Sequence, residues 1–217
     1  MTADLWLYRA VRALVVGFCR LFWRLDVDGL EHVPTDRPFV LAPVHRSNID
    51  TLVVAAVTKR RLRYMGKDSL WKVSAFGKLL SALGAFPVHR GSADREALRR
   101  CMAVVEGGEP LVIFPEGTRQ SGPIVQPLFE GAAYVAARTG VPVVPVGIGG
   151  SEAAMPKGSK LLRPVKVRVI VGPPIEPPAP ADGGKARMSR HAVHEVTERL
   201  ANELQALFDQ AQVRAGA

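Results

Sequence analysis

Apolar and polar positions along the chain form two kinds of segment. Short apolar runs are typical of buried strands, whereas longer stretches with apolar residues at every third or fourth position are typical of helices. The strand-like runs are residues 38–43, 63–66, 85–88, 111–114, 141–148 and 165–171, and helical patterns separate several of them. This alternation predicts an α/β fold around a largely buried sheet.

The first helical pattern covers residues 3–24 and is amphipathic. Four arginines fall on one arc of this helix at about 100° per residue: Arg9, Arg12, Arg20 and Arg24. They interrupt the apolar run before it reaches the roughly 18 residues that a spanning helix needs. A helix lying in the interface of a membrane fits this pattern, and so does a helix packed on the domain with a solvated basic face. No small-residue cleavage site follows the apolar part, so a signal peptide is not expected.

The last helical pattern covers about residues 188–213. It carries one apolar stripe, which predicts packing against the core. Residues 173–184 are rich in proline and glycine and are predicted to form a linker. We therefore expect an N-terminal amphipathic, membrane-associating helix over residues 1–24 and one domain over residues 25–217 that includes the C-terminal helix.

The most informative polar stretch is the turn at residues 45–50 (His-Arg-Ser-Asn-Ile-Asp), between an apolar strand and a helical pattern. His45 is predicted at the strand end. Asp50 is predicted in the first helical turn, where the helix dipole favours a carboxylate that reaches back to one imidazole nitrogen. The other nitrogen is then free to take a proton from a hydroxyl group at neutral pH. An ordinary polar turn, in which Asp50 caps the helix and His45 is solvated, has the same pattern.

Two further strands end in arginine and glycine. One continues into Pro-Glu-Gly-Thr-Arg at residues 115–119, and the other into His-Arg-Gly at residues 89–91. Ligands of α/β sheets usually bind at the carboxyl ends of the strands. Arg90 and Arg119 there suggest an anionic ligand that bears a phosphate. Glu116 has an alternative role, an ion pair with an arginine inside the turn.

Charge and cysteine content narrow the possible partners. The chain has 29 Lys and Arg against 20 Asp and Glu, a formal net charge of +9, which implies an anionic partner. A nucleic acid is not expected, because no helix-turn-helix, zinc-ligand or RNA-stacking motif accompanies the charge. A second basic cluster consists of residues 59–63 with Lys67, Lys72 and Lys78. It is a candidate for contact with lipid headgroups or with the phosphates of a bound donor substrate, and a solvated face has the same pattern. Cys19 and Cys101 give no disulfide framework and are interpreted as packing residues.

Four blocks of the sequence, taken together, resemble the glycerolipid acyltransferase family, which includes 1-acylglycerol-3-phosphate acyltransferases. In chain order they are residues 45–50, 85–91, 114–119 and 141–146. The resemblance implies that family's fold, with a mixed sheet flanked by helices. It also implies transfer of a fatty acyl group from an acyl thioester to the hydroxyl of a lysophospholipid, foremost 1-acyl-sn-glycerol-3-phosphate, which gives phosphatidic acid.

Carried over residue by residue, the resemblance implies that His45 is the general base and Asp50 its orienting partner. It assigns the acceptor site to Arg90, Glu116, Gly117, Thr118 and Arg119. The acceptor hydroxyl would attack the thioester directly, without a covalent acyl-enzyme. No metal or other cofactor is expected; acyl-coenzyme A or acyl carrier protein is the co-substrate. The expected location is the cytoplasmic side of the cell membrane, peripheral or monotopic, with an anionic membrane surface as partner.

The chain departs from the family's pattern in two places. Val44 stands where many members have Asn. Phe129 and Glu130 stand before a Gly-Ala pair where many members carry one or two lysines. The lost cation keeps one alternative open, an acyltransferase for a different lipid alcohol acceptor. A basic membrane-lipid-binding module without catalysis is a separate alternative, and the intact pair of His45 and Asp50 distinguishes the enzyme from it.

Overall fold

A seven-stranded mixed sheet is the centre of the computed structural model, which describes residues 3–88, 95–178 and 190–217. The strands are β1 (Asp26–Asp28), β2 (Val40–Pro43), β3 (Arg63–Lys67), β4 (Ala85–Val88), β5 (Leu111–Val112), β6 (Val143–Gly149) and β7 (Arg168–Val171). Their spatial order is β1-β7-β6-β2-β5-β3-β4. The five strands from β6 to β4 are parallel, whereas β7 is antiparallel to β6 and β1 is parallel to β7. The predicted α/β class is confirmed.

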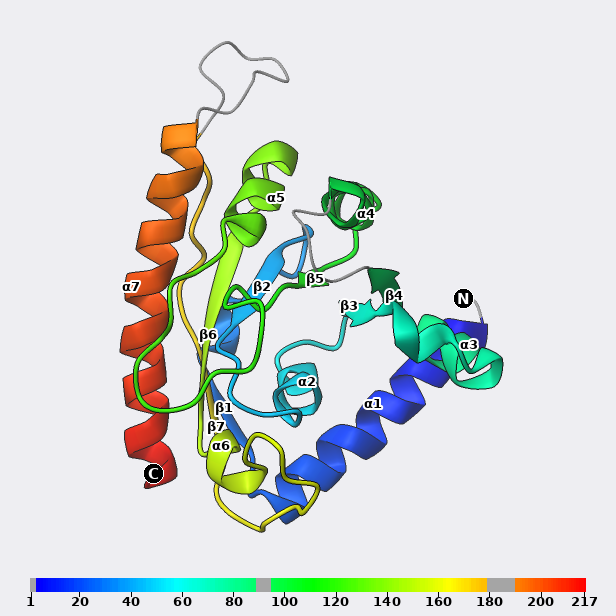
Figure 1. The fold of residues 1–217 in the computed structure, drawn as a ribbon, viewed down its shortest axis with the longest axis vertical. Helices are drawn as coiled ribbons and strands as arrows, with labels where there is room; N and C mark the ends of the chain where they lie inside the picture. The colour runs from blue at the N-terminus through cyan, green and yellow to red at the C-terminus, as the bar shows by residue number, and fades with distance from the viewer. Residues whose placement is uncertain (1–2, 89–94, 179–189) are drawn as a thin grey trace.

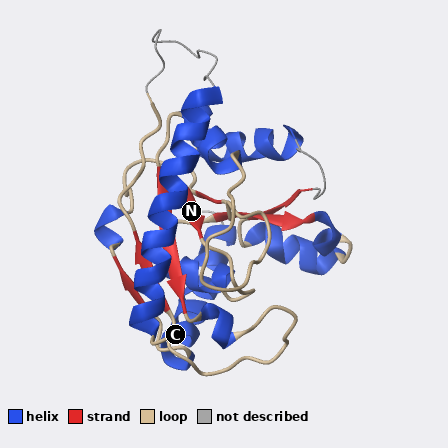
Figure 2. Ribbon diagram, turned by 60° about the vertical axis from the view of Figure 1, so that its left-hand side comes forward, coloured by secondary structure: helices blue, strands red, loops and turns tan. Residues whose placement is uncertain are grey.

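Helices flank both faces of the sheet (Figures 1 and 2). They are α1 (Ala3–Phe22), α2 (Asp50–Val53), α3 (Ser74–Ala82), α4 (Arg95–Glu106), α5 (Gly131–Thr139), α6 (Ser151–Ala154) and α7 (Arg190–Ala215), with the 3₁₀-helices η1 (Leu30–His32), η2 (Val54–Ala56) and η3 (Asp68–Trp71). The long helix α7 runs along β6 and β7. On the other side of the molecule, α1 lies beside α2 and α3 (Figure 1).

Several element bounds differ from the prediction for local reasons. The first helix ends at Phe22 because Arg24 has a positive φ of 46°, which turns the chain into β1. That strand was not predicted, since Asp-Val-Asp is too short and polar to read as one. The strand predicted over residues 111–114 stops at Val112, because the carbonyl of Phe114 already accepts the N–H of Gly117 in a turn.

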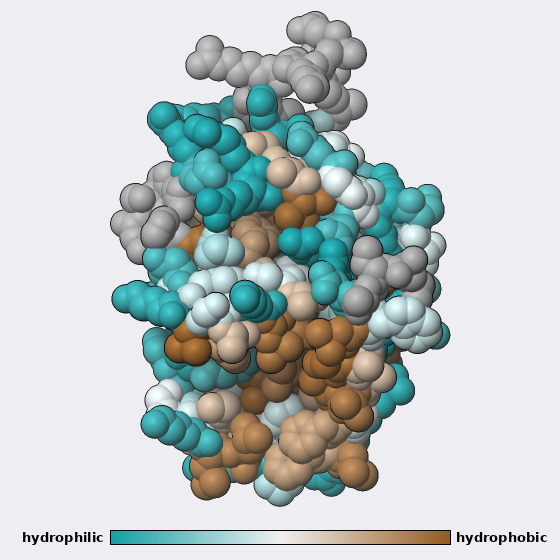
Figure 3. Space-filling view, turned by 90° about the vertical axis from the view of Figure 1, so that its right-hand side faces the viewer, coloured by the Kyte–Doolittle hydropathy of each residue, from teal (hydrophilic) through white to brown (hydrophobic). Residues whose placement is uncertain are grey.

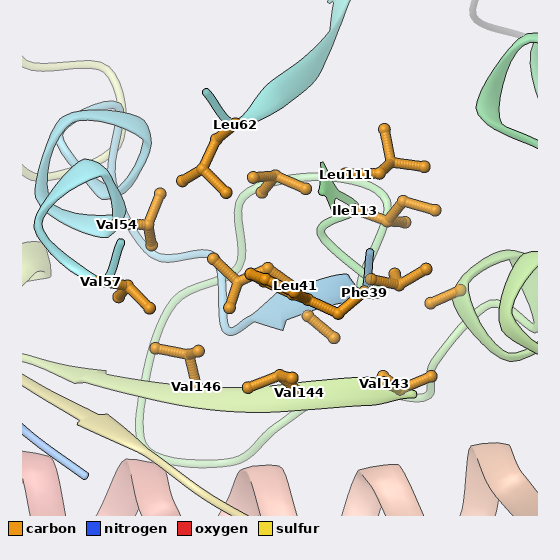
Figure 4. Packing of buried hydrophobic residues seen from close by; sticks show 14 of the residues in the cluster. Phe39, Leu41, Val54, Val57, Leu62, Leu111, Ile113, Val143, Val144 and Val146 are labelled. Carbon is orange, nitrogen blue, oxygen red and sulfur yellow. The ribbon is translucent and has the colours of Figure 1, made fainter. Parts of the chain in front are cut away.

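The core is centred on β2 and its neighbours. Phe39 and Leu41 lie between two groups of apolar side chains (Figure 4): Leu62, Leu111 and Ile113 on one side, and Val143, Val144 and Val146 on the other. A parallel strand that is covered on both faces is a continuous apolar run. Both β2 and β6 are buried along their whole length, which explains why each is a nearly continuous apolar run in the sequence.

One stripe of α1 belongs to this core. Val16 and Cys19 on this stripe join the core together with Trp23, which lies just after the helix, and Tyr8 on the same stripe is also buried. On the same side, Nε of Arg12 donates to the carbonyls of Ala55 and Thr58 at 2.8 and 2.7 Å. The predicted single arc of arginines is therefore divided: Arg12 is half-buried and faces the domain, whereas Arg9, Arg20 and Arg24 are exposed. The division of the chain at residue 24 stays a prediction.

The outward face of α1 carries large apolar side chains, and Arg9 and Arg20 of the same helix are exposed as well. Its exposed large side chains are Trp6, Leu7, Leu14, Phe18 and Leu21, and those of the neighbouring segment are Leu70, Val73, Phe76 and Leu79. Figure 3 shows apolar side chains gathered over the middle and lower parts of this face. Within the three described stretches of the chain, no helix has the length and apolar character needed to cross a bilayer.

Candidate active site

His45 and Asp50 meet in the turn between β2 and α2, as the spacing predicted. Nδ1 of His45 lies 2.9 Å from Oδ2 of Asp50. The carboxylate is fully buried, and the same oxygen accepts the backbone N–H groups of Arg46 and Ser47 at 2.7 Å each. One carboxylate oxygen thus holds both the backbone of the turn and the imidazole, with Nδ1 as the donor.

The imidazole of His45 is fixed from a second direction. The ring of Phe114 stacks on it with 4.0 Å between centroids and 24° between planes. The His45 side chain keeps 15% of its surface exposed, and no hydrogen bond from the described residues reaches Nε2. This nitrogen is therefore available to a ligand, while the rest of the ring is held in one orientation.

Arg46 and Glu116 form a buried ion pair next to His45. Nη1 of Arg46 lies 2.7 and 2.8 Å from the two oxygens of Glu116, and both residues are 1% exposed. Oε1 of Glu116 also accepts the backbone N–H of His45 at 3.0 Å, and Oε2 accepts that of Gln126 at 3.1 Å. Glu116 thus forms an ion pair with an arginine, as in the alternative noted from the sequence, but the arginine comes from the His45 turn and not from its own turn. Its contribution to an acceptor pocket stays a prediction.

Sequence reasoning missed Arg46, although Arg46 has the most extensive contacts in the site. Its Nε and Nη2 donate to the carbonyls of Gly122 and Ile124 at 3.2 and 3.0 Å, and its guanidinium lies 4.7 Å from the centre of the Phe208 ring in α7. The sequence feature that pointed to a buried arginine is Glu116. An acidic residue at the end of an apolar strand is buried at a high cost in free energy unless a cation accompanies it.

The residues after Glu116 form an open turn. Gly117 has a φ of 68°, which favours glycine, and a Cβ at this position would lie 2.6 Å from the exposed ring of Phe129, which would have to move. Gly117 and Thr118 are exposed. Arg119 is half-buried, and its side chain forms no hydrogen bond or ion pair with the described residues. The backbone N–H of Gln120 donates to the carbonyl of His45 at 2.8 Å, which places this turn beside His45.

Arg90, the other predicted phosphate ligand, lies outside the described residues, as does His89. A cavity of about 300 Å³ opens at the carboxyl ends of β3 and β4, immediately before that segment. It is lined by Asp68, Trp71, Pro87, Val88, Glu96, Ala97 and Arg100. The cavity lies on the same edge of the sheet as His45, at the outer strands.

The second basic cluster, at residues 59–63, is engaged within the protein. Arg60 donates to the carbonyls of Pro34, Arg37 and Gly108. Arg61 and Arg63 both pair with Glu109. These three arginines therefore hold loops together. The lysines of the cluster, Lys59, Lys67, Lys72 and Lys78, are exposed, and their contact with headgroups or donor phosphates stays a prediction.

Neither cysteine is placed as a nucleophile. Both are buried, and burial raises the pKa of Cys19 to about 11 and the pKa of Cys101 to about 12. The two thiols are therefore protonated at neutral pH, and their interpretation as packing residues is confirmed. Across the described parts of the chain, no three His, Cys, Asp or Glu side chains gather as metal ligands.

Comparison with known proteins agrees with this geometry. The family model described as Acyltransferase matches residues 24–149, more than half of the chain. A chloroplastic 1-acyl-sn-glycerol-3-phosphate acyltransferase of Brassica napus is 34% identical over 158 residues, which cover 71% of this chain and 46% of that protein. A 1-acyl-sn-glycerol-3-phosphate acyltransferase of Bacillus subtilis is 29% identical over 152 residues, which cover 70% of this chain and 73% of that protein. The chain spans just under half the length of the plant relative.

Among solved structures, the fold is similar to that of the 1-acyl-sn-glycerophosphate acyltransferase PlsC from Thermotoga maritima. The TM-score is 0.73 at 24% sequence identity, over 95% of this chain and 83% of that one. The matched family segment contains both the His45 turn and the Glu116 turn. The chain therefore belongs to the acyltransferase family.

Proposed function

We propose that the protein transfers a fatty acyl group from an acyl thioester to the hydroxyl of a lysophospholipid, with 1-acyl-sn-glycerol-3-phosphate as acceptor and phosphatidic acid as product. The observation that carries this proposal is the His45–Asp50 pair, in which Nδ1 is held at 2.9 Å and Nε2 is available. The names of the relatives support the choice of acceptor.

In this mechanism His45 acts as the general base through Nε2. The acceptor hydroxyl gives its proton to Nε2 as its oxygen attacks the thioester carbonyl; the C–S bond then breaks, and the leaving thiolate takes the proton from the imidazolium. Asp50 stabilises the imidazolium because its carboxylate contacts Nδ1. Ser47 is not the nucleophile, since its hydroxyl donates to the carbonyl of Met155 at 2.7 Å.

The acceptor phosphate binds at the open turn after Glu116. Arg119 supplies the charge, and Gly117 and Thr118 supply an exposed backbone that a phosphate can approach closely. Arg90 completes the site in this proposal. The acyl donor is acyl-coenzyme A or acyl carrier protein, and no metal or other cofactor takes part.

A second candidate is acyl transfer to a lipid alcohol with a less anionic headgroup. The observation that favours it is Phe129, which is 69% exposed and lies against Gly117 in the open turn. Glu130 adds a negative charge nearby, 3.8 Å from Nδ1 of His194. An aromatic ring and a carboxylate at this point disfavour a dianionic phosphate relative to a zwitterionic headgroup.

We place the protein on the cytoplasmic side of the cell membrane, held by the outward apolar face of α1. Deletion of residues 1–24 would not test this placement, because it would also disrupt the core. Trp23 is fully buried, and its Nε1 donates to the carbonyl of Arg163 at 3.1 Å. Replacement of Leu14 and Leu21 by serine leaves the buried stripe intact. We expect this double variant to bind liposomes more weakly than the unmodified protein while keeping its melting temperature.

The decisive experiment measures thiol release from palmitoyl-coenzyme A with lysophosphatidic acid and other lysophospholipids as acceptors. We expect release that depends on the acceptor and is lost in His45→Ala. Equal release by the variant would contradict the assignment of the base. If no acceptor promotes release, the same comparison is made with palmitoyl-acyl carrier protein; a negative result with both donors refutes the proposed function.

A further inference from the structure

A basic loop, residues 156–166, joins α6 to β7. Its cations are Lys157, Lys160, Arg163 and Lys166, and all four are exposed. Between them, Leu161 is 68% exposed and Leu162 is 38% exposed. No acidic residue occurs between Glu152 and Glu176. The proposed chemistry uses none of these side chains.

The charge of the basic loop is not neutralised within the described chain. The side chains of its four cations form no hydrogen bond or ion pair with the described residues. Two exposed leucines among unpaired cations suit the interface of an anionic bilayer, where leucines enter the acyl region and amines meet lipid phosphates.

The basic loop lies next to the catalytic turn. It follows β6, which pairs with β2 in parallel, so it starts from the same edge of the sheet as His45. The hydroxyl of Ser47 donates to the carbonyl of Met155, the residue before the loop. The N–H of Arg163 donates to the carbonyl of Ala154 at 2.9 Å, which folds the loop back onto α6.

The basic loop is also continuous with the outward face of α1. Trp23, just after α1, donates its indole N–H to the carbonyl of Arg163, and its own carbonyl accepts the N–H of Val167 at 3.0 Å. Figure 1 shows the loop beside the carboxyl end of α1. Phe18 and Leu21 are exposed at that end of the helix. The apolar face and the loop therefore form one surface.

We propose that the basic loop docks onto an anionic phospholipid bilayer, with Leu161 and Leu162 inserted into the interface and the four cations on lipid phosphates. Docking through this loop and the adjoining end of α1 turns the catalytic edge of the sheet toward the membrane. The benefit to catalysis rests on the proposed function, because a lipid acceptor reaches His45 from the bilayer. Docking itself does not depend on that chemistry.

Vesicle co-sedimentation tests the docking. We expect Leu161→Ser/Leu162→Ser to lower partition onto vesicles of phosphatidylglycerol and phosphatidylcholine by about tenfold. Lys157→Glu/Lys160→Glu should lower it by at least about tenfold, and should have no such effect on vesicles of phosphatidylcholine alone. The matched controls are Leu30→Ser and Lys59→Glu, two exposed residues at the opposite edge of the sheet, and both should partition like the unmodified protein.

A soluble assay separates docking from chemistry. With a short-chain, water-soluble lysophosphatidic acid and no vesicles, the turnover of both loop variants should stay within about twofold of that of the unmodified protein. With a long-chain acceptor in anionic vesicles, their turnover should fall by the same factor as their partition onto the vesicles. If the unmodified protein acylates no acceptor, the proposed function fails, and partition alone still decides the docking. Unchanged partition of both loop variants, or an equal loss in the controls, would overturn the docking.

Discussion

The turn at residues 45–50 and the turn at residues 116–119 lie side by side, but their polar groups are arranged in opposite ways. In the first, one oxygen of Asp50 accepts three hydrogen bonds, and Arg46 is enclosed by acceptors. In the second, the groups beyond Glu116 are exposed or lack a partner in the described residues, Arg119 among them. A base needs a fixed geometry before the substrate arrives, whereas a binding turn must keep its donors for the ligand.

The largest effect is expected from removing His45, the proposed base. His45→Ala should lower kcat by about 10²- to 10⁴-fold, the usual contribution of a general base. Its melting temperature should stay close to that of the unmodified protein, because the imidazole is held by the turn and does not support it. Asp50→Asn is the variant to compare with it, since Asp50 holds both the imidazole of His45 and the backbone of the turn. We expect it to lower kcat and the melting temperature together. Full turnover by His45→Ala would mean that the turn at residues 45–50 does not hold a catalytic base. The proposed contrast between a catalytic turn and a binding turn would then be wrong.

The next effect concerns the buried ion pair behind His45. Arg46→Met or Glu116→Gln leaves one buried charge without its partner, and we expect each to lower the free energy of unfolding by about 3–5 kcal/mol. The double variant removes both charges and keeps an oxygen that accepts the N–H of His45. Its loss of unfolding free energy should therefore be smaller than the sum of the losses in the two single variants. Urea denaturation of the four proteins measures this coupling.

An ion pair on the protein surface is the control for these measurements on the Arg46–Glu116 pair. Arg37 and Glu176 also form an ion pair, but their side chains are 46% and 53% exposed. Arg37→Met and Glu176→Gln should each change the free energy of unfolding by less than about 1 kcal/mol. Equal effects at the two pairs would mean that the Arg46–Glu116 pair does not act as a buried one.

The sequence predicted the parts of the site that depend on local order. His45 and Asp50 are five residues apart across a strand end and a helix start, and both elements have clear periodicity, so their contact was foreseeable. Arg46 was not, because its partners Glu116 and Phe208 are distant in the sequence. Nothing in the spacing of residues 45–50 shows which neighbour of the base points inward.

The surface proposed to face the membrane shows the same limit. Periodicity placed Arg9 and Arg12 on one arc of the first helix, but only tertiary packing decides which part of an arc is buried, and Arg12 turned out to hold Ala55 and Thr58. The basic loop has no periodicity at all. Its position beside Ser47 and Trp23 arises from contacts made across the fold.

A smaller effect is expected at the open turn. Arg119→Ala should raise KM for a phosphorylated acceptor by about 10- to 100-fold with little change in kcat, because a charge-assisted bond to phosphate acts in both the ground state and the transition state. Arg119→Lys should recover part of the loss, since it keeps the charge and loses the fork geometry. Steady-state kinetics with lysophosphatidic acid measures both. A fall in kcat at constant KM would place Arg119 with the base rather than with the binding turn.

The smallest effect is expected at Phe129, which borders the open turn. Phe129→Lys restores a cation where many family members carry lysine, and the exposed position accepts it without burying charge. We expect the ratio of kcat/KM for lysophosphatidic acid to that for lysophosphatidylcholine to rise by about three- to tenfold, since one exposed charge contributes little more. Glu130→Gln is the control: its carboxylate lies near His194 on α7, and its removal should shift the ratio less. A ratio that falls in Phe129→Lys would mean that the acceptor phosphate does not approach this side of Gly117, and the phosphate site would then have to be sought on the far side of Arg119.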